Sequence, residues 1–419
     1  MIKLYIMVLA LLGIHSSVRA VEIVVDPNGT TRTVSEALAQ SRDGDVVTIR
    51  PGTYNEHGLV VEHSITLRGQ SGAVIDARQA KGSIIIVNAD NVTITGLAIR
   101  NVGVSYVDEN AAIKVLRRRN TTIEHCTIEN GFFAIYLERC VDVRIRFNRI
   151  ISKNHEQANS GNGIHAWTCR NVLVEGNTIK GHRDGVYFEF MKQGTVLRNH
   201  SEGNLRYGLH FMFSDSCSYR ENLFTKNGAG VAVMYTKYIE MFDNDFRDNW
   251  GSAAYGLLLK EITNSHLRGN RFIGNSVGIH GEGASRCLIE RNVFHSNGYA
   301  VRLMGNCNDD LFLQNTFDGN SFDVTTNTSH SDNKFDGNYW SEYSGYDLNH
   351  DGIGDVPHHP VRLYSMLVEQ VPSSVILMHS LFVDILDFTE RVIPSVTPQT
   401  LTDMHPSMRP PFSEVSTRP

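Results

Sequence analysis

Apolar and polar residues alternate in short runs from about residue 120 to residue 340, and the runs recur with a regular period. Each period contains an asparagine followed, two residues later, by phenylalanine or isoleucine, as in "RENLFTKN" and "FDNDFRDN". These asparagines are spaced 22 to 29 residues apart, at Asn148, Asn177, Asn199, Asn222, Asn244, Asn270, Asn292, Asn315 and Asn338. Short strands that repeat in this way, separated by Asn, Gly and Asp turns, predict stacked supersecondary units. A leucine framework, which leucine-rich repeats of similar period require, is absent. We therefore predict an all-β chain, a parallel β-helix over residues 21–345 with a ladder of asparagine side chains.

A second recurring strand carries the candidate chemistry. It begins at a small residue, as in "GIHAW", "GVYFE", "GLHFM" and "GVAVM", and its first and third following positions are apolar. Because side chains alternate along a strand, these positions point inward and the second and fourth point outward. The inward set is Ile164, Val186, Phe188, Leu209, Phe211, Val231, Leu257, Ile279 and Leu303.

The outward positions hold histidine and methionine where a surface strand usually holds threonine or lysine. His210 and Met212 share one strand, and Met234 follows Met212 in the same column one coil on. Imidazole and thioether donors favour Cu(I) over hard cations, so these three residues form the main predicted copper site. Weaker copper candidates on the same face are His165, His280 and Met304. The alternative is an apolar patch for a partner protein, since methionine and aromatic residues are enriched at interfaces.

Composition and the N-terminal segment indicate which partners and which compartment the sequence favours. The chain has 419 residues and a formal net charge of −6, which argues against nucleic acid as a partner. Lys3, the apolar run "LYIMVLALLGI" and the small residues before position 21 predict a secretory signal peptide, residues 1–20, cleaved near Ala20. An uncleaved membrane anchor is the alternative. Export would permit a disulfide between Cys140 and Cys169, which lie one coil apart, although packed thiols fit the pattern equally well.

Residues 346–360 form an acidic loop after the last coil. Asp347, Asn349, Asp351 and Asp355 occupy positions 1, 3, 5 and 9 of a calcium loop. His358 stands at position 12 in place of the usual glutamate, so the pattern predicts either a weak calcium site or a loop stabilised by Asp and Gly.

Residues 361–419 form a tail of different character. Apolar residues recur at helical spacing around Pro372, which predicts a mostly helical or extended tail that caps the solenoid or docks on a partner. The end of this tail, "DMHPSMRP", adds Met404, His405 and Met408 as further copper candidates on a segment expected to be flexible.

The chain resembles the NosD family of periplasmic proteins that serve the maturation of nitrous oxide reductase. The resemblance rests on "GNGIH", "RDGVYFE", "RYGLHFMF", "GNYWSEYSGYDLNHDGIGD" and "MHPSMRP", in this order along the chain. It implies a right-handed β-helix in the periplasm that supplies copper, or a sulfur-containing cargo, to the reductase. It also implies partnership with the permease and ATPase of an ABC transporter, bound through the tail, and with a copper-donating lipoprotein. The opening "TVSEALAQSRDGDVVTIRPGTY" is typical of a pectin-lyase-like β-helix, with a short helical cap before the first strand.

Two other classes of function remain open. Polysaccharide-cleaving or carbohydrate-binding proteins share this fold, but cleavage needs clustered carboxylates. The outward carboxylates of the second strand, Glu138, Glu189 and Glu282, are separated by two or more coils. A structural adaptor is the third possibility. We therefore expect a protein that is not an enzyme, and we expect removal of residues 361–419 to abolish transporter association while the solenoid stays folded.

Overall fold

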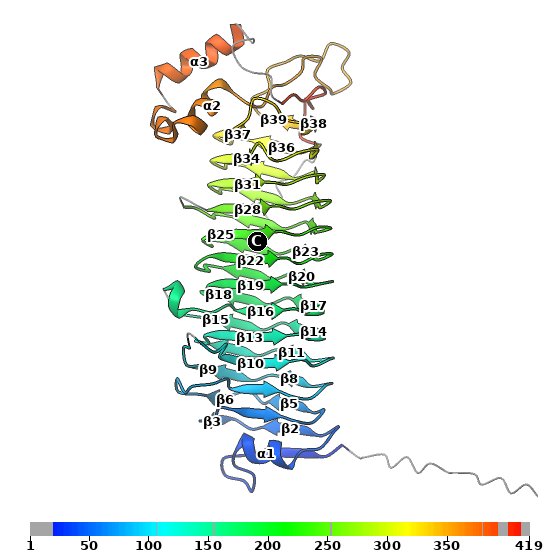
Figure 1. The fold of residues 1–419 in the computed structure, drawn as a ribbon, viewed down its shortest axis with the longest axis vertical. Coiled ribbons are helices and arrows are strands. Elements are labelled where there is room, and N and C mark those ends of the chain that lie inside the picture. Colours follow the sequence, from blue (N-terminus) through cyan, green and yellow to red (C-terminus); the bar gives the residue numbers. More distant parts are fainter. Residues whose placement is uncertain are drawn as a thin grey trace, which may run out of the picture.

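The computed structural model describes residues 20–105, 107–153, 156–251, 254–378, 380–392 and 401–411. The predicted signal peptide lies outside the described residues, except for Ala20. In the described part, three parallel sheets of 14, 13 and 12 strands run along one long solenoid (Figure 1). The coils wind in the right-handed sense. The predicted parallel β-helix is therefore confirmed.

Each coil contributes one strand to each sheet, so that consecutive strands of a sheet come from successive coils. The 14-stranded sheet contains β1 (Glu22–Val25), β2 (Val46–Ile49), β5 (Thr66–Gly69), β8 (Thr93–Thr95), β11 (Thr122–Glu124), β14 (Val141–Arg146), β17 (Arg170–Glu175), β20 (Thr195–Leu197), β23 (Ser218–Arg220), β26 (Glu240–Phe242), β29 (His266–Arg268), β32 (Leu288–Glu290), β35 (Leu311–Leu313) and β38 (Lys334–Asp336). The 13-stranded sheet contains β3 (Gly52–Tyr54), β6 (Ala73–Asp76), β9 (Ala98–Arg100), β12 (Thr127–Glu129), β15 (Arg149–Ile151), β18 (Thr178–Lys180), β21 (His200–Glu202), β24 (Leu223–Thr225), β27 (Asp245–Arg247), β30 (Arg271–Ile273), β33 (Val293–His295), β36 (Thr316–Asp318) and β39 (Tyr339–Trp340). The 12-stranded sheet contains β4 (Leu59–Val61), β7 (Ile85–Val87), β10 (Ala111–Leu116), β13 (Phe133–Glu138), β16 (Ile164–Trp167), β19 (Asp184–Glu189), β22 (Tyr207–Met212), β25 (Ala229–Met234), β28 (Tyr255–Lys260), β31 (Val277–Glu282), β34 (Tyr299–Leu303) and β37 (Phe322–Thr326).

One continuous apolar core fills the solenoid. All nine residues predicted to point inward from the 12-stranded sheet belong to this core, with relative exposures of 3% or less. Aromatic rings stack on successive coils inside it, as in Phe246–Phe272, with centroids 4.6 Å apart, and Phe317–Trp340, with centroids 4.2 Å apart. The strand alternation read from the sequence therefore has the correct phase.

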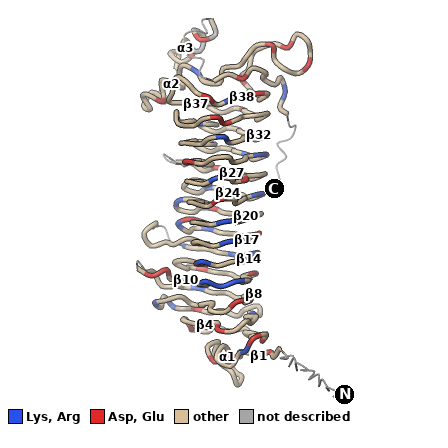
Figure 2. Tube along the Cα trace, turned by 45° about the vertical axis from the view of Figure 1, so that its right-hand side comes forward, with Lys and Arg blue, Asp and Glu red and all other residues tan. Residues whose placement is uncertain are grey.

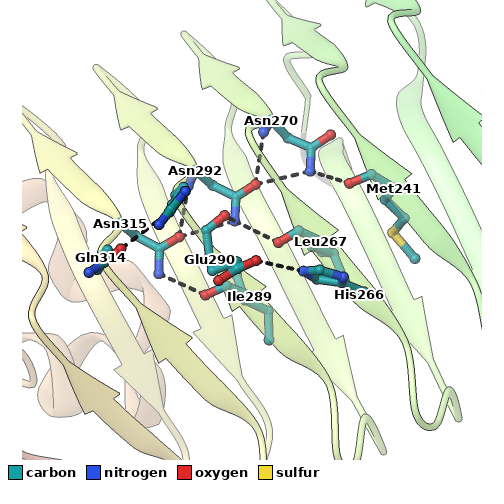
Figure 3. A network of polar contacts seen from close by, with 10 residues as sticks. Met241, His266, Leu267, Asn270, Ile289, Glu290, Asn292, Gln314 and Asn315 are labelled. Atoms are coloured by element: carbon teal, nitrogen blue, oxygen red, sulfur yellow. Dashed lines mark hydrogen bonds and ion pairs between the residues drawn. The ribbon is translucent and has the colours of Figure 1, made fainter. Parts of the chain in front are cut away.

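The predicted asparagine ladder forms where each coil turns from the 14-stranded to the 13-stranded sheet. The Nδ2 of Asn270 donates to the Oδ1 of Asn292, and Asn292 donates in turn to Asn315, at 2.9 and 3.0 Å (Figure 3). Each Nδ2 also donates to a main-chain carbonyl, such as that of Met241 or Leu267. Buried turn groups are thereby satisfied coil after coil, which a solenoid needs because its turns are covered by their neighbours.

A second ladder, which the sequence analysis missed, follows the turn from the 13-stranded to the 12-stranded sheet. It consists of Asn204, Asn227, Asn249, Asn275, Asn297 and Asn320. His182 occupies the corresponding position one coil earlier, where its main-chain N–H donates to Asn204 Oδ1. The asparagine of "TKNGAG" and its equivalents five residues after the first ladder could have revealed it.

Caps close both ends. At the N-terminal end, helix α1 (Val34–Gln40) begins with a capping box made by Thr33 and Glu36. At the other end lie α2 (Leu363–Gln370), a 3-10 segment η2 (Pro372–Leu377) and α3 (Leu381–Val392) (Figure 1). Tyr364 and Val368 of α2 pack with Phe322 of β37. None of the helices in the described ranges is both long and apolar enough to cross a membrane.

Residues 401–408 are part of the C-terminal cap, which differs from the flexible end that we expected. Asp403 is fully buried and accepts hydrogen bonds from the main-chain N–H groups of Gly337 and Asn338, from Asn338 Nδ2 and from Trp340 Nε1, at 3.0 to 3.1 Å. It therefore ends the first asparagine ladder. The sequence pattern could not reveal this because the bonded groups are more than 60 residues apart.

Candidate functional site

Met212 and Met234 are paired in register on the outward face of neighbouring strands β22 and β25. Both side chains are partly exposed, while Phe211 and Val233 beside them are in the core. Neighbouring parallel strands lie about 4.8 Å apart, so two thioethers lie on adjacent coils of one column, as predicted from the period. The O–H of Tyr187, on β19, donates to Met212 Sδ at 3.6 Å. Burial raises the pKa of Tyr187, so this hydroxyl keeps its proton at neutral pH.

His210 is nearly buried, although it points away from the core. Its side chain is 5% exposed and lies between the rings of Tyr187 and Tyr207, with centroids 4.8 and 4.9 Å away. The stack continues through His165 to Tyr136. We expected an exposed imidazole, but a column of outward rings on successive coils covers its own members. The histidine is therefore held in a fixed position on an aromatic column.

An ion pair between the buried Asp184 and the partly exposed Arg206 determines which nitrogen of His210 is available. Arg206 donates from Nε and Nη2 to the two carboxylate oxygens of Asp184, at 3.0 and 2.9 Å, and Asp184 has no exposed surface. Nη2 of Arg206 also lies 3.0 Å from His210 Nδ1. Because arginine can only donate, Nδ1 must accept, and the neutral imidazole carries its proton on Nε2. That Nε2 is buried without a hydrogen-bond partner. A metal ion can therefore reach a free lone pair of His210 only where Arg206 releases Nδ1.

His280 and Met304 lie together in a hollow, three and four coils beyond His210. The hollow has a volume of about 510 Å³ and also contains Glu282, Asn306 and Asn327. The ring of Tyr255 stacks on His280 at 4.9 Å. Burial, followed by the nearby Arg302, lowers the pKa of His280 to about 4, so this imidazole is neutral at pH 7. His165 lies two coils before His210 in the same aromatic stack, 3.0 Å from the side-chain amide of Asn162, and burial lowers its pKa to about 3.

The outward face of the 12-stranded sheet offers few other groups that could bind a metal ion. Within the described ranges, no three His, Cys, Asp or Glu side chains come together in a way that could hold a metal ion. Glu138 faces Arg117 at 3.6 Å, and Glu282 is paired with Lys260 at 3.0 Å, so two of the three outward carboxylates are in ion pairs. Among the described residues, this face therefore offers a metal ion no cluster of three nitrogen, oxygen or thiol ligands.

The six cysteines are buried thiols. The main-chain N–H of Cys140 donates to Cys169 Sγ at 3.2 Å, which agrees with the predicted position of the two residues on adjacent coils. Burial raises the pKa of Cys126 and Cys217 to about 12. Since the thiolate is the metal ligand, these two residues act as packing groups at neutral pH.

The acidic loop is closed by its own hydrogen bonds. Asp347 accepts from the main-chain N–H groups of Asp351 and Gly352, at 3.2 and 2.8 Å, and Asp355 accepts from Leu348 at 2.7 Å. His358, at position 12 of the pattern, is instead paired with Asp403 through the main chain and stacks on Trp340. Calcium binding by Asp347, Asn349, Asp351 and Asp355 stays a prediction.

The tail residues lie on the C-terminal cap. Met404 is 56% exposed. His405 Nδ1 lies 2.7 Å from Asp336 Oδ1, and this hydrogen bond raises the pKa of His405. Asp336 therefore competes with any metal ion for His405.

These features define a pectin-lyase-like parallel β-helix with an outward column of methionine and aromatic residues. Solved structures of the same fold are similar to it. The catalytic unit of an α-1,3-glucanase from Streptomyces thermodiastaticus is 15% identical with a TM-score of 0.55, covering 72% of this chain and 65% of that one. A Yersinia enterocolitica family 28 exopolygalacturonase is 12% identical with a TM-score of 0.50, covering 76% and 78%. At this identity the likeness shows the fold alone.

Sequence comparison is more specific. Residues 147–345 match the family model described as periplasmic copper-binding protein (NosD). A "Probable ABC transporter binding protein NosD" from Pseudomonas aeruginosa is 30% identical over 377 residues, 85% of this chain and 86% of the relative. A protein of the same description from Stutzerimonas stutzeri is 28% identical over 380 residues, 86% of each chain. The chain belongs to the NosD family.

Proposed function

We propose that this protein is a periplasmic accessory protein in the assembly of the copper centre of nitrous oxide reductase, and that it binds and passes on Cu(I). Family membership supports copper and the periplasm. The observation that carries the assignment to particular residues is the pairing of Met212 with Met234 on an outward, partly exposed column. Two neutral thioethers suit Cu(I) and reject hard cations.

In this proposal Met212 and Met234 bind the ion, and His210 controls how tightly it is held. While Arg206 donates to His210 Nδ1, the imidazole contributes no lone pair, and the site has only sulfur ligands. His210 Nδ1 also lies 3.7 Å from Asp184 Oδ2, on the side away from Met212, so it becomes a third ligand only if Arg206 releases it and the ring turns towards the sulfurs. A site that alternates between two and three ligands suits a protein that must release its cargo. His280 with Met304, His165, and the cap residues Met404, His405 and Met408 are weaker candidates.

The first prediction concerns the methionine column. Replacing Met212→Ala together with Met234→Ala should weaken Cu(I) binding about tenfold or more, equivalent to about 1.4 kcal/mol. Titration against a chromophoric Cu(I) chelator measures the affinity, and circular dichroism checks that the variant is folded. Met304→Ala and the pair Met404→Ala with Met408→Ala are matched controls and should change affinity less than about threefold. An unchanged affinity in the folded double variant would remove the site from this column.

We also propose that α3 docks on the membrane permease of an ABC transporter, in keeping with the description of the two relatives as probable ABC transporter binding proteins. Leu381, Ile385 and Phe388 recur at helical spacing and are 74%, 54% and 68% exposed, whereas Val383 on the other side is 6% exposed. The preceding helix α2 is fixed to the solenoid by the ion pair between Glu369 and Arg302, at 2.7 Å. A fixed base therefore presents an apolar ridge with no partner among the described residues. The reductase and a copper-donating lipoprotein are the further partners that we propose.

The second prediction tests this ridge without removing the cap. Ile385→Asp with Phe388→Asp should abolish co-purification with the transporter, because two carboxylates would have to be buried unpaired in the interface. Cu(I) affinity should be unchanged. Val107→Asp, at a residue that is 88% exposed far from α3, is the matched control. Full retention of the complex in the double variant would place the docking surface elsewhere.

A further inference from the structure

An open groove runs along the solenoid on a corner that the methionine column does not reach. It follows the turn from the 12-stranded to the 14-stranded sheet, has a volume of about 820 Å³, and is lined from Arg119 at one end to Tyr238 and Glu240 at the other. The residues Arg119, Val141, Arg170, Lys192 and Asp215 occupy successive coils in register at this corner. With Tyr238 one coil further on, five steps of about 4.8 Å give a length of about 24 Å.

Small side chains create the hollow. Thr195 and Ser218 are paired on the outward face of the 14-stranded sheet, where the neighbouring coils carry Leu173 and Glu240. Gly194 and Ser216 lie beside them in the lining. The floor is thus lower than the surface at either end, and it is covered with hydroxyl groups.

The walls are amides and arginines that hold one another in place. Arg170 Nε donates to Gln193 Oε1 at 2.9 Å, and Asn171 Nδ2 donates to Asp142 Oδ1 at 2.6 Å. The other polar atoms of Arg170, Gln193 and Asn171 have no side-chain partner among the described contacts. Side chains that are fixed by one hydrogen bond and keep further donors and acceptors are suited to binding a polar ligand with little loss of entropy.

The groove carries a small excess of positive charge. Arg119 is exposed and forms no side-chain hydrogen bond or ion pair within the described residues, and Arg170 is bonded only to a neutral amide. Of the two carboxylates in the lining, Asp142 opposes the two arginines and Glu240 is paired with Arg220, which lies just outside the lining. Lys192 and Asp215 at the same corner carry opposite charges, so the excess comes from Arg220. Lys and Arg segments recur along the coils around β10, β14 and β17 (Figure 2). A ligand with carboxylates and many hydroxyl groups would match this distribution.

We propose that the groove binds a carboxylated polysaccharide chain lengthwise. An extended peptide is less suitable for two reasons. The strands under the groove use their main-chain groups within the sheet, so a peptide cannot add a strand there. The lining also has few apolar anchor residues of the kind on which peptide interfaces depend, Tyr238 being the main exposed ring. Hydroxyl-rich floors with amide and arginine walls fit the alternating donors and acceptors of sugars.

The test is a binding titration of the full mature protein with an oligogalacturonate long enough to span the groove. Soluble peptidoglycan fragments form a second arm, since both carry carboxylates on a glycan, and a neutral maltooligosaccharide of equal length is the reference. We expect at least one acidic glycan to bind more tightly than the neutral one. Arg119→Ala with Arg170→Ala should weaken that binding about tenfold, and Ser218→Phe, which fills the floor, should weaken it independently.

Arg268→Ala with Arg286→Ala provides a matched control, because these arginines lie on the same side of the solenoid in coils beyond the groove. Three results would overturn the proposal. These are failure of both acidic glycans to bind, unchanged glycan binding by the Arg119/Arg170 variant, and tighter binding of an acidic peptide of equal charge. Cu(I) affinity should be the same in all of these variants, so a failure here leaves the proposed copper function untouched.

Discussion

At the scale of single residues, burial rather than sequence position determines what the polar groups near the methionine column can do. Asp184 has no exposed surface, so its charge must be neutralised by a partner that is fixed in place. Arg206 is that partner, and its donation to His210 Nδ1 sets the tautomer of the imidazole. One arginine therefore links the stability of the coil to the availability of a predicted copper ligand.

The third prediction follows from this link. Arg206→Ala leaves the buried Asp184 carboxylate without its arginine and with only His210 Nδ1 nearby, at 3.7 Å. This should lower the free energy of unfolding by about 3 kcal/mol, as measured by urea denaturation. Arg220→Ala is the matched control, because it removes an arginine–carboxylate pair from Glu240, in which both partners are more than 40% exposed. That control should cost less than about 1 kcal/mol. Equal losses in the two variants would contradict the role assigned to burial.

His182 gives the fourth prediction, which concerns pH. It is fully buried, and burial lowers its pKa from 6.5 to about 4, against a smaller opposing effect of the main chain of Gly161. Above pH 6.5 the ring is neutral in both folded and unfolded chains. As the pH falls from 6.5 towards 4, the unfolded chain takes up the proton first, so folding loses up to about 3 kcal/mol from this residue.

His182→Asn should remove this loss, since asparagine would extend the second ladder towards Asn204. At neutral pH the lost ring volume should lower the free energy of unfolding by about 1 kcal/mol. Between pH 6.5 and 4 the stability of the variant should fall less steeply than that of the unmodified protein, and thermal melting at each pH measures this. His330→Asn, at an exposed imidazole, controls for the substitution and should follow the unmodified protein. A variant as acid-sensitive as that control would refute the assignment.

At the scale of elements, local periodicity made the strands predictable, and contacts between distant segments made the caps unpredictable. The spacing of Asn148 and its equivalents predicted the coils and the column of Met212 and Met234. This worked because each coil repeats the same alternation of inward and outward side chains and the same asparagine turn. The burial of His210 could not be predicted in this way, since it depends on Tyr187 and Tyr207 stacking from two coils. Asp403 reaches Trp340 across 63 residues, and no local pattern records such a contact.

The structure of the C-terminal cap also changes how an experiment that removes residues 361–419 would be interpreted. Removing residues 361–419 was expected to leave the solenoid folded, but Asp403 accepts hydrogen bonds from buried donors of the last coil, including the indole N–H of Trp340, whose relative exposure is 1%. Loss of the tail would uncover these groups as well as α3. Point substitutions on α3 therefore separate docking from folding, which the truncation cannot do.

At the scale of the whole molecule, the solenoid keeps its surfaces independent. Each coil contacts mainly the coil before and after it, so stability is close to a sum of nearest-neighbour interactions and a defect spreads only a short way. The methionine column lies on β22 and β25, the groove passes the same coils on another corner and ends at β26, and the cap begins beyond β38. Damage to one end should consequently leave the middle of the molecule intact.

Asp403→Ala provides the fifth prediction, which tests this independence. The substitution leaves the Asn338 amide, the Trp340 indole and two main-chain N–H groups without their acceptor, at about 1–3 kcal/mol for each buried group left unsatisfied. Hydrogen exchange followed by mass spectrometry should show about tenfold or faster exchange in peptides covering β35 to β39, from residue 311 to residue 340. Peptides covering β16 to β25 should exchange at the original rate, and Cu(I) affinity should not change.

Asp336→Asn, which affects only the exposed contact with His405, should leave the exchange rate of every peptide unaltered. If the Asp403 variant instead exchanged faster along the entire solenoid, the coils would be coupled as a single cooperative unit, and variants at the cap could not be interpreted separately from those at the methionine column.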